Sequence, residues 1–109
     1  MIDMKIYDDP ELKKLIQTIH FGKVEAGSSK TITLYLLNDS KAVLTNLVYE
    51  FPSLPSSETL EVHGPITIQS GKQGELILTW KPSVNFKRAL VLDLLIRAEE
   101  VYLAEENIS

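Results

Sequence analysis

Hydrophobic residues recur at every second position through most of the chain, which is the period of a β-strand and not of a helix. Residues 30–38 place one isoleucine and two leucines on one face, and two threonines, Tyr35 and Leu37 on the other. Threonine and tyrosine suit the outer face of a half-buried strand. The pattern predicts a strand over residues 30–38 with Tyr35 on its outer side.

The same alternation predicts further strands along the chain, and residues typical of turns separate them. We expect these strands at 16–21, 43–51, 59–63, 66–69, 75–81 and 90–101. The residues that separate them are an Asn-Asp-Ser turn at 38–41, a Pro- and Ser-rich stretch at 51–57, a Gly-Pro pair at 64–65, a Gly-rich turn at 70–74 and a Pro-Ser pair at 82–83. The sequence therefore predicts an all-β protein, an immunoglobulin-like antiparallel β-sandwich of about seven strands.

The two ends of the chain depart from this pattern. We expect residues 1–15 to form an N-terminal arm, residues 16–104 the sandwich, and residues 105–109 a frayed acidic tail. In the arm, Asp9 is suited to cap a short helical turn and Pro10 to occupy its first position. An irregular arm and an arm that supplies a first strand fit the pattern equally well.

Composition narrows the class of protein. A length of 109 residues gives room for one domain, and the absence of cysteine excludes disulfides and thiolate metal sites. The net charge of −4 argues against a nucleic-acid binder, whose affinity comes mainly from basic groups. The N-terminus shows no secretory signal pattern and no apolar run is long enough to span a membrane, so we expect a cytoplasmic location unless the chain joins a larger particle.

The residues that could carry chemistry lack partners at the required spacing. His20 and His63 have no metal-ligand or nucleophile pattern around them. Asp8, Asp9 and Glu11 do not follow a calcium-loop spacing, and the Gly71–Gly74 segment lacks the phosphate-loop motif. The serine pairs at 28–29 and 56–57 belong to a turn and a linker. We therefore expect no catalytic residue, no metal, no cofactor and no enzymatic activity.

The aromatic residues leave two interpretations open. Trp80 shares a face with Leu76 and Leu78, which favours a core position over a platform for sugar stacking. Tyr35 next to Leu37 suits either a cover for the sheet or a protein-contact patch. A carbohydrate- or surface-binding module therefore remains an alternative that depends on the exposure of Tyr35 and Trp80.

Several segments resemble one group of families. They are Phe21–Gly27, Thr31–Leu37 with the following Asn38-Asp39-Ser40, Ile66–Gly71 and Leu76–Pro82. Their order is similar to the immunoglobulin-like modules of the ASH and major-sperm-protein type, over about residues 16–103. The resemblance implies a sandwich fold and a non-enzymatic, protein-binding role, for which a bacterial immunoglobulin-like scaffold subunit is an alternative.

A second likeness is to small stand-alone phage virion proteins. It rests on the arm Lys5–Leu12, the Phe-Gly-x-Val-x-x-Gly strand, and Trp80–Val84 followed by Lys87-Arg88. This resemblance implies a structural or decoration role, with capsid or tail proteins as partners and the virion as the location after synthesis in the bacterial cytoplasm. It leaves the partner, the host and the oligomeric state open, a homo-oligomer included.

The hypothesis for the contact surface centres on the N-terminal arm. The arm carries more apolar residues than a core this small is expected to take up. The residues that we expect to touch another protein are Ile2, Met4, Ile6, Tyr7, Tyr35 and Leu37. The alternative, that the arm supplies a strand of its own sheet, has equal weight.

Overall fold

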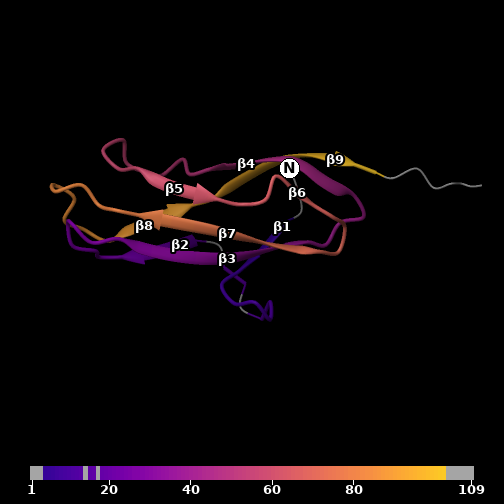
Figure 1. Ribbon diagram of the computed structural model, residues 1–109, viewed down its shortest axis with the longest axis horizontal. Coiled ribbons are helices and arrows are strands. Elements are labelled where there is room, and N and C mark those ends of the chain that lie inside the picture. The colour runs from indigo at the N-terminus through magenta and orange to yellow at the C-terminus, as the bar shows by residue number, and fades with distance from the viewer. Residues whose placement is uncertain (1–3, 14, 17, 103–109) are drawn as a thin grey trace, which may run out of the picture.

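The computed structural model describes residues 4–13, 15–16 and 18–102, and in these residues the chain is built from β-strands without a helix. The strands are β1 (Met4–Tyr7), β2 (Thr18–Gly22), β3 (Lys30–Asn38), β4 (Val43–Glu50), β5 (Leu60–His63), β6 (Thr67–Ile68), β7 (Gln73–Trp80), β8 (Leu90–Asp93) and β9 (Leu95–Val101). Figure 1 shows them stacked as two layers of antiparallel strands, of which β3, β4, β7 and β9 are the longest. The predicted immunoglobulin-like β-sandwich is therefore confirmed.

One layer is a four-stranded sheet in the order β1-β3-β7-β5. The facing layer consists of a three-stranded sheet, β6-β4-β9, and the pair β2-β8. The strand predicted over 90–101 is divided at Leu94, because β8 pairs with β2 whereas β9 pairs with β4. Between them the Asp93 amide donates to the Ser53 hydroxyl (2.9 Å), so a side chain from the connection after β4 replaces a backbone partner there.

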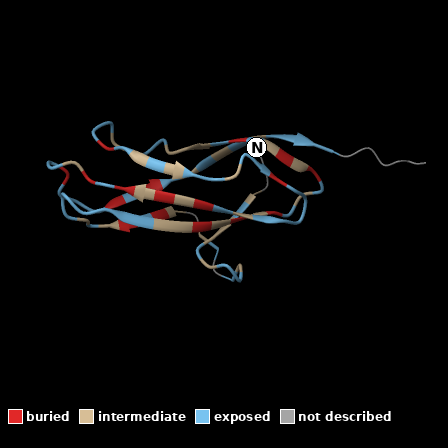
Figure 2. Ribbon diagram, in the orientation of Figure 1, coloured by how far each residue is buried: buried red, intermediate tan, exposed pale blue. Residues whose placement is uncertain are grey.

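The core lies between the layers, where the inward faces of the strands meet. The four-stranded sheet contributes leucines of β3 and β7 together with Trp80, and the other layer contributes Phe21, Leu44, Leu90 and Leu92. Figure 2 shows the buried positions as red bands that interrupt exposed or half-buried ones along β3 and β7. The alternation in the sequence therefore corresponds to inward and outward side chains.

A β-bulge in β4 breaks this alternation at one place. The pairing of β4 with β9 shifts register between Thr45 and Val48, and Asn46 adopts a left-handed backbone with φ of 54°. Asparagine accepts this conformation more readily than most residues. The extra residue allows both Leu44 and Leu47 to be buried although an odd number of positions separates them.

Asn38 joins the two layers where the chain leaves β3 for β4. Its buried side-chain amide donates to the carbonyls of Ala42 and Ile68, both at 2.9 Å, and its Oδ1 accepts from the amide and hydroxyl of Ser40. Its backbone carbonyl accepts from the Gly71 amide at 2.7 Å. One residue therefore fixes the β3–β4 turn, β6 and the β6–β7 turn together, because buried polar groups need such partners.

A tight contact next to this region depends on glycine. A side chain at Gly64 would meet Leu76 Cδ1 at 2.7 Å and the ring of Tyr49 at 2.9 Å. The Tyr49 hydroxyl donates to the Pro65 carbonyl at 2.6 Å, and burial raises the pKa of Tyr49 to about 12. The Gly64-Pro65 turn is thus packed against β4.

Substitution Asn38→Ala is expected to lower the free energy of unfolding by about 2–4 kcal/mol, because the carbonyls of Ala42 and Ile68 lose their buried donor. Urea denaturation of both proteins measures the difference. Asn85→Ala, in an exposed loop, is the matched control and should change stability by less than about 0.5 kcal/mol. A loss below about 1 kcal/mol for Asn38→Ala would contradict the role given to Asn38.

Candidate protein-contact surface

The outer side of the four-stranded sheet brings two tyrosines together. In the antiparallel register Tyr7 of β1 lies opposite Tyr35 of β3, and Lys5 lies opposite Leu37. Residues directly opposite each other point to the same face of a sheet. Because Leu34 and Leu36 point to the core, Tyr7, Tyr35 and Leu37 share the outer face, where each is half-buried.

The neighbouring strand β7 extends this surface. Ile77 lies opposite Thr33 and is also half-buried, and Glu75 lies opposite Tyr35. We call Tyr7, Tyr35, Leu37 and Ile77 the contact face. It combines two aromatic rings and two aliphatic side chains with a carboxylate at its margin, a composition typical of the centre of a protein interface.

The residues predicted as contacts are therefore divided between two faces. Tyr7, Tyr35 and Leu37 lie on the contact face, whereas Met4 and Ile6 point inward and pack against the core. Ile2 lies outside the described residues. Of the two roles that the sequence left open for the arm, pairing within its own sheet is the one that the structure shows for Met4–Tyr7; contact with a partner stays a prediction for the outward residues.

The arm is held from both sides. Lys5 Nζ lies 3.1 Å from Asp39 Oδ2, and the Ile16 amide donates to the Ile6 carbonyl at 2.9 Å. After β1 the chain turns around Asp9, whose carboxylate accepts from the Lys13 amide, so the described residues 8–13 form a turn and not a helix. These contacts fix Tyr7 in register with Tyr35.

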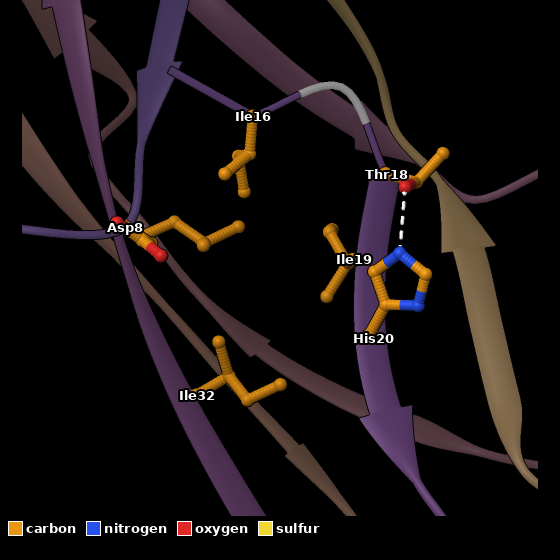
Figure 3. Close-up of a pocket in the computed structure, with 7 residues that line it drawn as sticks. Asp8, Ile16, Thr18, Ile19, His20 and Ile32 are labelled. Carbon is orange, nitrogen blue, oxygen red and sulfur yellow. Dashed lines mark hydrogen bonds between the residues drawn. The ribbon is translucent and has the colours of Figure 1, made fainter. Parts of the chain in front are cut away.

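Neither histidine sits in a catalytic arrangement. His20 borders a hollow of about 410 Å³ whose lining also includes Asp8, Thr18, and apolar side chains of Ile16, Ile19, Ile32 and Leu34. Figure 3 shows the His20 ring turned toward Thr18, with Asp8 across the hollow; a hydrogen bond of 3.0 Å joins the ring Nε2 and the Thr18 hydroxyl. His63 contacts Glu61 at 3.1 Å, but both side chains are 66% exposed on β5. A base and a carboxylate do not meet in a cleft in either place.

The described part of the chain also lacks the residue groups that other classes of function need. No cluster of three or more histidine, aspartate or glutamate side chains in it is suited to hold a metal ion. Gly71 has φ of 73° and lies in a turn. Its amide donates to the Asn38 carbonyl and is therefore not directed at a phosphate, so this segment is not a phosphate-binding loop. Within the same residues, no helix has the length and apolar character needed to cross a bilayer.

Trp80 is fully buried, which removes it as a platform for sugars. Its ring makes edge-to-face contacts with Phe21 at 5.8 Å and Phe86 at 5.4 Å between centroids. Arg88 in turn lies 4.7 Å from the centroid of the Phe86 ring. The core position predicted from the alternation is the one observed.

A buried carboxylate that the sequence analysis missed lies beside Trp80. Glu58 Oε1 accepts from Trp80 Nε1 and from the Ser83 amide, both at 3.0 Å. Its Oε2 accepts from the hydroxyls of Ser83 (2.7 Å) and Ser57 (2.8 Å). Glu58 thus ties the connection after β4 to the end of β7.

The four hydrogen bonds determine the ionisation of Glu58. Burial by itself raises the pKa of a carboxyl group, because it disfavours the charged form. The uncharged donors from Ser83, Ser57 and Trp80 outweigh this effect and lower the pKa of Glu58 to about 2. The carboxylate is a structural anchor with all its oxygens occupied. It is not a proton donor at neutral pH.

One signal in the sequence could have revealed Glu58. A buried tryptophan needs an acceptor for its indole N–H, and Trp80 was assigned to the core. The composition of the stretch from 51 to 57, in which prolines and serines dominate, predicts a linker instead. Glu58, which is the acceptor, immediately follows that stretch.

Comparison with known proteins gives one match. Residues 13–95 match the family described as ASH, "Abnormal spindle-like microcephaly-assoc'd, ASPM-SPD-2-Hydin". The chain belongs to the ASH family. A search of curated proteins and a search of solved structures gave no match. The ASH match covers β2 to β8, and leaves out β1 and all of β9 except its first residue.

Acid is expected to destabilise the wild-type protein more than Glu58→Gln. The pKa of Glu58 in the folded protein is about 2, below its ordinary value of 4.5. The carboxylate therefore contributes its full stabilisation above about pH 4.5 and loses it as the pH falls toward 2. Denaturant midpoints measured from pH about 6 down to about 2.5 test this.

Glu61→Gln is the matched control, because Glu61 is an exposed carboxylate in the strand that follows Glu58. It should keep the wild-type dependence of stability on pH. Parallel curves for wild type and Glu58→Gln would show that Glu58 is not the anchor described above.

Proposed function

We propose that the protein is a non-enzymatic structural module that binds another protein through its contact face. The ASH family is a family of non-catalytic interaction modules, and this supports the general class of function. The observation that carries the proposal is the register of β1 and β3, which places Tyr7 and Tyr35 side by side on the solvent side of the sheet.

The composition of the contact face supports protein binding. Tyrosine is enriched at the energetic centres of protein interfaces, because it buries a large area with little loss of side-chain entropy. Leu37 and Ile77 add apolar area to the two rings, and Glu75 and Lys5 supply charge around them. Since hydrogen bonds on both sides of β1 hold Tyr7 in place, a partner meets a largely preformed surface.

The sugar-binding alternative loses its main support in the structure. It needed exposed aromatic rings at Trp80 and Tyr35, and Trp80 has no exposed surface. The enzymatic alternative needed a cleft with a histidine beside a carboxylate. Because His20 pairs with Thr18 and His63 lies on an open strand, neither histidine supports it.

We further propose that the partner belongs to a larger assembly, and that this assembly is a phage particle. The support is the sequence likeness to small virion proteins in the arm Lys5–Leu12 and in Trp80–Val84. The arm is the segment that supplies Tyr7 to the contact face, so the likeness and the proposed contact concern the same residues. Synthesis in the bacterial cytoplasm followed by incorporation into the particle is the corresponding location.

A photo-crosslinking amino acid at Tyr35 is expected to capture a discrete partner protein in producing cells, because Tyr35 lies at the centre of the contact face. Mass spectrometry of the crosslinked product identifies the partner. The same amino acid at Val91 is the control, since Val91 is exposed on the outer face of β8 in the other layer. Crosslinks of equal yield and identity at both positions would contradict the proposal.

Association with a particle has a separate test. Particles released by cells that carry the gene are purified through a density gradient, and the chain is expected to stay with them. Tyr35→Thr, which keeps a residue suited to a strand, should lower the amount retained at least about tenfold, whereas Val91→Thr should not. A chain that is absent from washed particles would contradict the virion location and leave the contact face itself to the crosslinking test.

A further inference from the structure

β9 is the longest sheet-edge strand in the described part of the chain. It ends the sheet β6-β4-β9 and pairs on one side, with β4. β2 pairs with the preceding strand β8 and begins at Thr18, opposite Asp93, so its register does not extend along β9. The edge strands β1, β5 and β6 have four residues or fewer, against seven in β9. An edge of this length presents unpaired backbone groups to which another strand can bind.

Large apolar side chains are exposed at both ends of this edge. Leu95 is 50% exposed, Val101 is 45% exposed, and Tyr102 immediately after the strand is 65% exposed. Figure 2 shows the distal part of β9 as exposed where it extends beyond the core. Proline, which commonly protects an edge from pairing, does not occur in β9.

We infer that β9 pairs with β9 of a second copy of this chain, antiparallel, about a two-fold axis at Ala98. A two-fold axis requires that the same residues meet in both directions, so the strand must be complementary to itself. The axis at Ala98 places Arg97 of one copy opposite Glu99 of the other, and Leu95 opposite Val101. All four of these positions point to the outer face of the sheet, because Ile96 and Ala98 between them pack against the core.

The two neighbouring registers that keep inward residues opposite inward ones fail on charge. An axis at Arg97 places that guanidinium opposite its own copy, and an axis at Glu99 does the same for that carboxylate. Like charges directly opposite each other destabilise a strand pair, whereas opposite charges stabilise it. Shifts of a single position in the pairing would place an inward residue opposite an outward one, which a continuous sheet does not allow.

On the inner side of the same register, Ala98 meets Ala98, which leaves room at the axis, and Tyr102 of one copy lies opposite Leu94 of the other. The remaining inner pair is Ile96 opposite Glu100, whose exposed carboxylate accepts from the Tyr102 hydroxyl of its own chain at 3.0 Å. Leu94 is half-buried against the core, so it can take up part of the exposed ring. The three large exposed hydrophobic side chains at this edge, Leu95, Val101 and Tyr102, thus each gain an apolar neighbour.

Contacts within each chain already orient the charged groups. Arg97 Nε lies 2.9 Å from Glu50 Oε1 on β4, and Asn46 Nδ2 donates to Glu99 Oε1 at 2.9 Å. Both side chains therefore lie over the outer face with one partner on β4, and the proposed pairing adds a second partner across the free edge. The bulge at Asn46 supplies one of these contacts, which links the irregularity of β4 to the proposed interface.

Charge reversal tests the pairing directly. Arg97→Glu alone and Glu99→Arg alone each place like charges opposite one another in a pair of identical copies, and each should weaken self-association at least about tenfold. An equimolar mixture of the two variants restores opposite charges at every contact and should dimerise. Analytical ultracentrifugation of the full chain, alone and mixed, measures this. Variants that stay dimeric, a mixture that stays monomeric, or a wild type that is monomeric up to about 1 mM would each overturn the inference.

The register has its own test, because the chain has no cysteine. Ala98→Cys is expected to form an intermolecular disulfide on mild oxidation, since opposed Cβ atoms lie about 4.5–5.5 Å apart. Arg97→Cys and Glu99→Cys are the controls; their thiols would be diagonal neighbours, about 7–8 Å apart, and should crosslink far more slowly. Crosslinking that is as fast at position 97 or 99, or that is absent at 98, would overturn the register.

This interface does not depend on the proposed function. β9 and the contact face belong to different sheets. Failure of the charge-reversal experiment would leave binding through Tyr7 and Tyr35 untouched, and failure of the crosslinking at Tyr35 would leave the dimer untouched.

Discussion

The structure depends on the hydrogen bonds of one buried side chain, the amide of Asn38. A sandwich can bury its core only if the chain crosses from one sheet to the other at a defined point, and the crossing exposes backbone groups that have no strand to pair with. Asn38 meets this need by donating to the carbonyls of Ala42 and Ile68 and by accepting from Ser40. Asn38 also lies opposite Met4 of β1, at one end of the β1–β3 pairing whose other end places Tyr7 opposite Tyr35.

The long strands of the fold can be predicted from the alternation of apolar and polar side chains, but two features of the fold cannot. Strands β3, β7 and the run from 90 to 101 could be predicted because each needs only one face to be apolar. The bulge at Asn46 could not be predicted. Leu44 and Leu47 are three positions apart, so a regular alternation would place only one of them in the core, yet both are buried. The division at Leu94 was also hidden, because it reflects a change of pairing partner between β2 and β4 and not a change in composition.

The candidate site was predictable only in part for a similar reason. The outward position of Tyr35 follows from its own strand. Its neighbour Tyr7 requires the register between β1 and β3, which depends on long-range pairing. Met4 and Ile6 were grouped with Tyr7 because all belong to one apolar arm, yet successive residues of a strand point to opposite faces. Glu58 was missed because three of its four hydrogen bonds come from Trp80 and Ser83, more than twenty residues away in the sequence.

The bulge in β4 has a consequence for how this domain can vary in length. Deletion of Asn46 would remove the extra residue, so Leu44, Leu47 and Tyr49 would lie on the inner face of a regular strand and Val48 and Glu50 on the outer one, as they do now. Deletion of Val48 would instead turn Tyr49 outward and bring Glu50 into the oily interior. Homologues can therefore be expected to lack the bulge residue or to vary in the connection at 51–57, but to keep the number of residues in β4 on either side of the bulge.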